Sequence, residues 1–187
     1  MATVDENLFT VLMQEFNSLR AEILARSNAQ HTLLNLNVTI LGTLIGFAIA
    51  GREGGAPLLL LLVPLVSNSI GFLYLDHHTA IQRAGVYIDQ YIRPVLQELV
   101  LSKRAMSWET FFNEHFWRRG TSKVVFWAPL SILFVAGPIG ATVYTFPLLN
   151  SDVALTAVWA LGVLTEIGLF TTSIMLFSRR WVKGYRS

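Results

Sequence analysis

Residues Val153–Ser178, VALTAVWALGVLTEIGLFTTSIMLFS, decide the fold class of this chain. The segment is 26 residues long and apolar except for hydroxyl groups and one carboxylate, Glu166, near its middle. About 20 apolar residues already cross the ~30 Å hydrocarbon core of a bilayer as an α-helix. The stretch therefore predicts a transmembrane helix. A carboxylate at that depth predicts other helices around it, because ionisable groups in membranes face protein or water.

The composition agrees with a membrane protein. Of the 187 residues, 53% are hydrophobic and only 14% are charged, whereas soluble domains carry roughly 25% charged residues. Cysteine is absent, which excludes disulfides, thiolate metal sites and cysteine nucleophiles. No phosphate-binding loop, serine-hydrolase elbow or zinc-protease helix motif is present. No motif therefore points to an enzyme, a cofactor or a metal site, and we expect no nucleic-acid partner.

Three further apolar runs accompany the first. They cover residues 32–50, 57–75 and 124–147, and with 153–178 they make four predicted spans. Short turns at 51–56 and 148–152 join the spans into two transmembrane hairpins, 32–75 and 124–178. The predicted fold class is all-α: a polytopic membrane helical bundle of four transmembrane helices, whose long helices extend into a cytoplasmic helical layer.

The regions outside the spans are also predicted to be helical. Within residues 1–31, an amphipathic helix from Asp5 to Gln30 contains no Gly or Pro, so we expect it to continue into the first span as one long helix. Its apolar seam has spacings of 4, 3 and 4 and consists of Leu12, Phe16, Leu19 and Ile23. Residues 76–123 continue the second span beyond the membrane, and 179–187 form a basic tail.

Prolines predict irregularities in three of these helices. Pro64 is expected to kink the second span, Pro94 to bend or interrupt its extension, and Pro138, in a Gly-Pro-Ile-Gly sequence, to break the third span.

The distribution of positive charge predicts the orientation. Of the 14 Lys and Arg residues, only Arg52 lies on the side of the two short turns, and the other 13 lie opposite. The positive-inside rule then places both termini and residues 76–123 in the cytoplasm. The predicted localisation is a multi-pass protein of the inner membrane, with anionic lipids attracted to its cytoplasmic face.

Part of the cytoplasmic segment has the pattern of an interfacial helix. Aromatic residues share one face and two arginines close the end; the residues are Trp108, Phe111, Phe112, Arg118 and Arg119. Packing of this helix against the amino-terminal helix is an alternative interpretation.

Polar residues within the spans are the candidate functional residues. Glu166 is interpreted either as an ion or proton site in a pore, or as a packing residue bonded to Asn35, Asn68 or a hydroxyl of a neighbouring span. Asn35, Thr39 and Thr43 share one face of the first span, and with Ser67 and Asn68 of the second they could line a water path or bond between helices. Gly42, Gly46 and Ala50 are predicted to form a second face of small residues suited to helix contact.

Three histidines lie near the predicted cytoplasmic interface: His31, His77 and His78. They are candidates for an interface or for pH sensing. Adjacent histidines on a helix point in different directions, so neither segment has the spacing of a metal site.

Two parts of the sequence resemble a group of small bacterial integral membrane proteins without an assigned activity. They are Tyr87-Ile-Asp-Gln-Tyr-Ile-Arg-Pro94 followed by Trp108-Glu109, and Phe16-Asn-Ser-Leu-Arg-Ala-Glu-Ile-Leu-Ala-Arg26. This resemblance implies a bacterial inner membrane. The layout of small cytoplasmic helices on a hydrophobic bundle is also similar to pore-forming effectors of bacterial defence systems.

Three functions follow from these features. The first is a homo-oligomeric channel or pore-like assembly, with a membrane-perturbing effector as one form of it, since the polar and small-residue faces exceed what one thin bundle can cover. The alternative is a non-conducting scaffold that recruits a cytoplasmic partner through its cytoplasmic helices. A third, weaker alternative is a lipid-binding or lipid-modifying protein that uses the interfacial helix.

Overall fold

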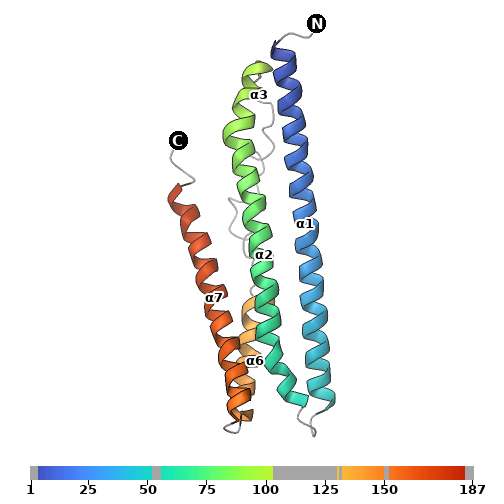
Figure 1. Cartoon of the computed structure of the whole chain (residues 1–187), viewed down its shortest axis with the longest axis vertical. Coiled ribbons are helices and arrows are strands. Elements are labelled where there is room, and N and C mark those ends of the chain that lie inside the picture. Colours follow the sequence, from blue (N-terminus) through green and yellow to red (C-terminus); the bar gives the residue numbers. More distant parts are fainter. Residues whose placement is uncertain (1–3, 52–55, 103–129, 131, 150–151, 184–187) are drawn as a thin grey trace. The chain divides into compact units, whose positions relative to one another are not determined.

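The computed structural model describes residues 4–51, 56–102, 130, 132–149 and 152–183, and helices dominate these residues, with no strand among them. This confirms the predicted all-α class for the described part of the chain. The elements, in chain order (Figure 1), are α1 (Val4–Ala50), the 3₁₀ helix η1 (Ala56–Leu61), α2 (Leu62–Tyr87), the π-helix η2 (Ile88–Ile92), α3 (Arg93–Leu99), the π-helix η4 (Ile132–Ala136), α6 (Gly137–Thr145), the 3₁₀ helix η5 (Phe146–Leu148) and α7 (Val153–Lys183).

The chain divides into two compact units. The first consists of Met1–Gln30 and His77–Phe126, and the second of His31–Asp76 and Trp127–Ser187. The 47-residue helix α1 contributes its beginning to the first unit and its end to the second, so the amino-terminal helix and the first apolar run form one helix, as the sequence predicts.

The first unit is built on an antiparallel helix pair. The beginning of α1 runs beside the end of α2, η2 and α3 (Figure 1). Its core consists of Ile88, Ile92 and Leu96, which are buried against five residues of α1: Leu12, Met13, Phe16, Leu19 and Ile23. Four of these five are the predicted apolar seam, which therefore packs against a neighbouring helix of the same chain.

The second unit contains the most apolar segments. Three helices are long and apolar enough to cross a membrane: Glu6–Ala50, Ala56–Leu99 and Val153–Leu176. A shorter apolar helical segment covers Ile132–Leu148. Of the predicted third span, 124–147, the structure describes residues 130 and 132–147.

Two apolar clusters hold the second unit together. One is formed by Ile70, Tyr74, Phe134 and Leu169, and the other by Leu41, Val63 and Ala141. Glycine permits the closest approaches: a Cβ at Gly162 of α7 would lie 2.9 Å from Cγ of Pro64, and one at Gly71 of α2 would lie 2.8 Å from Cδ2 of Leu169.

Prolines shape the helices in two different ways. Pro94 and Pro138 each follow a π-helix by two residues, η2 and η4 respectively. A proline ring clashes with the carbonyl four residues earlier and lacks an N–H, and a wider turn relieves both constraints. The predicted irregularities at these two residues are therefore present. Pro64, predicted to kink the second span, lies instead in the first turn of α2, directly after η1, where a missing N–H costs little.

The residues of the predicted interfacial helix, Trp108 to Arg119, lie outside the described part of the chain.

Candidate functional site

A set of hydrogen-bonded polar side chains lies inside the second unit. We call it the buried polar belt, and its members are Asn37, Ser67, Asn68, Thr142, Thr165 and Glu166. The first link joins α1 to α2: Nδ2 of Asn37 donates to Oγ of Ser67 at 3.1 Å. The Ser67 hydroxyl in turn donates to the carbonyl of Leu133 at 3.1 Å, within the π-helix η4.

The second and third links join α2 to α7 and α7 to α6. Nδ2 of Asn68 donates to the Thr165 hydroxyl at 3.1 Å, and the Thr142 hydroxyl donates to Oε1 of Glu166 at 2.8 Å. Ser67 and Asn68 are neighbours in sequence, and so are Thr165 and Glu166. The belt therefore connects all four helical segments of the second unit through two pairs of adjacent residues.

The belt is buried but not fully bonded. Asn37, Ser67 and Asn68 have 0% relative exposure, and Thr142 has 7%. Oδ1 of Asn37 and Oδ1 of Asn68 have no hydrogen-bond partner among the described residues. Since each amide keeps one of its two polar atoms paired, the belt stabilises the contacts between helices while leaving two acceptor atoms uncompensated.

A second polar feature lies on the opposite side of α1. Each residue of a helix is rotated by about 100° from the one before it, so residues three or four positions apart lie near one another around α1. We consider the residues within an arc of about 80° that begins at Asn35. We call this set the outer stripe. All its members are exposed; in the second unit they are Thr32, Asn35, Thr39, Thr43, Gly46 and Ala50.

The outer stripe lies opposite the core face of α1, and its side chains are small or polar. The buried residues Asn37, Leu41 and Ala48 point away from it. The Thr39 and Thr43 hydroxyls donate to the carbonyls of Asn35 and Thr39, both at 2.8 Å. The Asn35 side chain makes no hydrogen bond to the described residues. An ideal Cβ at Gly46 would have no other atom within 4 Å, so nothing described in the chain covers this part of the stripe.

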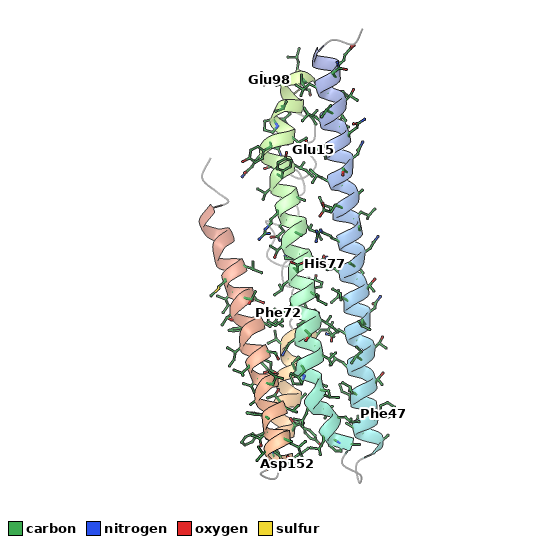
Figure 2. All side chains as sticks on the ribbon, viewed as in Figure 1. Glu15, Phe47, Phe72, His77, Glu98 and Asp152 are labelled. Carbon is green, nitrogen blue, oxygen red and sulfur yellow. The ribbon has the colours of Figure 1, made fainter. Side chains whose placement is uncertain are left out.

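Other exposed faces of the second unit carry large apolar side chains instead. On α7 these include Leu164, Ile167 and Phe170, at 64%, 55% and 58% relative exposure. Large apolar residues also flank the outer stripe on α1 itself: Leu36, Val38, Ile45, Phe47 and Ile49. Figure 2 shows Phe47 at the end of α1 and Phe72 of α2, whose ring lies against Gly168 of α7. The outer stripe is therefore a continuous run of polar and small residues among exposed apolar faces, where single hydroxyls such as those of Ser69 and Thr171 are also exposed.

The register of the outer stripe continues in the part of α1 that belongs to the first unit. The residues there are again exposed and uncharged: Asn7, Thr10, Gln14, Asn17, Ala21, Ala25 and Asn28. Glu6, which is exposed, lies about 20° from the register of Asn35. Glu15, Glu22 and Arg26 lie farther around the helix. Glu22 and Arg26 form a salt bridge at 2.8 Å, and Glu15 accepts the Tyr87 hydroxyl at 2.8 Å.

The structure distributes the sequence-predicted path residues over these two features. Asn68 and Glu166 belong to the buried polar belt, whereas Asn35, Thr39 and Thr43 belong to the outer stripe. Glu166 is half-buried and bonded to a hydroxyl of a neighbouring segment, which is the bonding that its interpretation as a packing residue requires. Gly42, Gly46 and Ala50 were predicted to form a separate face. Around α1 they lie about 20°, 20° and 60° from Asn35, so they adjoin the face of Asn35.

Sequence reasoning identifies Ser67, Asn68 and Glu166 of the belt and misses Asn37, Thr142 and Thr165. Asn37 could have been recognised, because it shares the helical spacing of Leu34, Leu41 and Leu44 and therefore lies on the core face. The partners from α6 and α7 carry no such signal, since hydroxyl residues also occur on the exposed faces.

The histidines occupy separate environments. His31 is exposed, whereas Nδ1 of His77 is buried without a hydrogen-bond partner among the described residues. Nε2 of His78 lies 2.8 Å from Nε2 of Gln82. Within the described residues, no group of three or more His, Asp or Glu side chains is arranged to hold a metal ion.

In the first unit, the side chain of Glu15 extends from α1 to α2 (Figure 2). Its bond with Tyr87 raises the pKa of that phenol, because the hydroxyl proton is held by the carboxylate. The Tyr87 ring stacks on Tyr91 with centroids 5.2 Å apart, and Tyr91 is 62% exposed.

Comparison of the chain with protein-family models, with curated proteins and with solved structures finds no match. The functional argument therefore depends on the geometry of the belt and of the outer stripe.

Proposed function

We propose that this chain is the four-span subunit of a homo-oligomeric channel in a bacterial inner membrane, with the outer stripe of α1 lining the conduction path. In this proposal, residues 32–50, 57–75, 124–147 and 153–178 cross the bilayer. Both termini and residues 76–123 lie in the cytoplasm, as the distribution of Lys and Arg favours. Anionic lipids are the expected neighbours of the basic cytoplasmic side.

The observation that carries the proposal is the exposure of the outer stripe. A hydrocarbon environment favours large apolar side chains, and α7 presents such side chains. The outer stripe, in the same unit, presents an amide, hydroxyls and glycine. An amide without a hydrogen-bond partner costs roughly 2–7 kcal/mol in an apolar medium. Water in a pore between copies removes that cost for Asn35.

The buried polar belt has a different role in this proposal. Its side chains bond to one another between helices, so it fixes the positions of α2, α6 and α7 behind α1. Membrane helices use such bonds for packing, at about 0.6 kcal/mol each on average. Glu166 is then a packing residue that supports the channel wall, while the outer stripe forms its surface.

A liposome flux assay with two matched glycine variants tests the proposal. Gly46 lies on the outer stripe and Gly140 on the exposed face of α6, and an added Cβ meets no atom within 4 Å at either position. Gly46→Leu should reduce ion flux toward that of empty liposomes, because the side chain narrows the path. Gly140→Leu should conduct as the wild type does, because its side chain enters lipid.

Two results would contradict the proposal. Wild-type flux equal to that of empty liposomes would show that the chain does not conduct. Equal flux in wild type, Gly46→Leu and Gly140→Leu would show that the path lies elsewhere. Asn35→Leu gives a second check on the stripe, since it should also lower flux. The hydrogen bonds of the buried polar belt should stay intact, because Asn35 takes no part in them.

A scaffold function has one specific observation in its favour. The stacked rings of Tyr87 and Tyr91 form an exposed aromatic surface on the first unit, with Tyr91 62% exposed. Exposed aromatic residues are frequent anchors of protein interfaces. Recovery of a stable cytoplasmic complex that Tyr91→Ala abolishes, together with absence of flux, would favour the scaffold over the channel.

A further inference from the structure

We infer that the channel does not select by charge and passes small cations, small anions and small neutral polar solutes alike. This inference depends on the proposed function, because it assigns a class of permeant solute to the path along the outer stripe.

The first argument is the absence of charge from the stripe. Its six positions in the second unit are occupied only by Asn, Thr, Ala and Gly. Channels that select cations or anions place rings of acidic or basic side chains along the pore. In a symmetric assembly each position of α1 is repeated in every copy, so a single charge on the stripe would produce such a ring. The stripe supplies none.

The second argument is that the second unit supplies no other charge to the path from α1. Residues 31–50 of α1 contain no Asp, Glu, Lys or Arg. The carboxylate of Glu166 belongs to α7 and is bonded to Thr142 of α6, so it does not add a charged ring to the stripe.

The third argument concerns the polar atoms that remain. An amide both donates and accepts hydrogen bonds, so Asn35 can contact the hydration shell of an ion of either sign. The Thr39 and Thr43 hydroxyl protons are committed to carbonyls of α1, which leaves their oxygens as acceptors. Acceptor oxygens favour cations slightly, without the strength of a full charge.

Reversal potentials in a planar bilayer with a KCl gradient test the inference. The wild-type protein should give a permeability ratio of K⁺ to Cl⁻ of about one. Asn35→Asp places a ring of carboxylates on the stripe and should shift the reversal potential toward that of K⁺. Glu22→Gln, which removes an exposed charge outside the stripe, should leave the wild-type ratio unchanged.

The outcomes separate this inference from the channel itself. A wild-type current with a permeability ratio above about ten in either direction, equivalent to about 1.4 kcal/mol of discrimination, would overturn the inference and leave the channel standing. An unshifted reversal potential in Asn35→Asp would also overturn it, since the stripe would then not face the permeant ion. Absence of current in the wild type would instead overturn the proposed function.

Discussion

Asn35 and Asn37 stand two positions apart on α1, which turns their side chains about 200° apart around the helix. Asn37 is fully buried and donates to Ser67, whereas Asn35 is exposed. The same residue type therefore serves helix packing at one position and, in our proposal, water at the other. Which asparagine has which environment depends on the helical register of the apolar core face.

The Tyr87–Glu15 bond gives a prediction for the first unit at the same scale. Because the bond raises the pKa of Tyr87 in the folded protein, the folded state retains its proton at pH values where the unfolded chain loses it. The stabilisation is therefore fully present below the pKa of an unperturbed tyrosine, about 10, and is lost as the pH rises through the pKa of Tyr87 in the folded protein.

Spectrophotometric titration of the phenols measures this effect. Because Tyr74 is buried, the titration is made in a Tyr74→Phe background. One tyrosine of that variant should ionise above the ordinary range, and that component should be absent when Tyr87→Phe is added. Tyr144, on α6, offers a matched control, since Tyr144→Phe should retain the component. A high-pH component that persists in Tyr87→Phe would assign it to another residue.

At the scale of the elements, close helix contacts depend on two glycines. A methyl group at Gly162 would meet the ring of Pro64, which cannot rotate away, whereas one at Gly71 would meet the flexible end of Leu169. Gly162→Ala should therefore lower the free energy of unfolding by about 1–3 kcal/mol, as overpacking does. Gly71→Ala should have a smaller effect, because Leu169 can change its rotamer.

Thermal unfolding in detergent compares these variants with Gly140→Ala. Gly140 has open space around it, so alanine there should be neutral or stabilise α6 by up to about 1 kcal/mol through helix propensity. Equal melting temperatures for Gly162→Ala and Gly140→Ala would contradict the close contact between α2 and α7.

At the scale of the whole molecule, the prediction concerns orientation in the membrane. The chain contains no cysteine, so a single introduced thiol reports its side of the membrane without background. Arg52→Cys should react with a membrane-impermeant maleimide in intact spheroplasts. Ser102→Cys should react only in inverted vesicles or after permeabilisation, because positive charge retains its segment in the cytoplasm. Reaction of both thiols from the same side would contradict the proposed four spans.

The amino-acid sequence by itself determined the helical class of this protein, the joining of its amino-terminal helix to the first apolar run, and the irregular turns near Pro94 and Pro138. These features depend on local quantities: helical periodicity, the length of apolar runs and the geometry of the proline ring. The seam from Leu12 to Ile23 was also predictable, because an apolar stripe has to be buried against a neighbour.

The tertiary structure alone decided which polar residues pair. The partners of Asn68 and Glu166 lie 97 and 24 residues away along the chain, on other helices, so no local pattern specifies them. It also decided which face of α1 is covered, and therefore that Asn35, Thr39, Thr43 and Gly46 form one exposed stripe. The physical reason is that burial depends on which helices pack together, whereas periodicity fixes only which residues share a face.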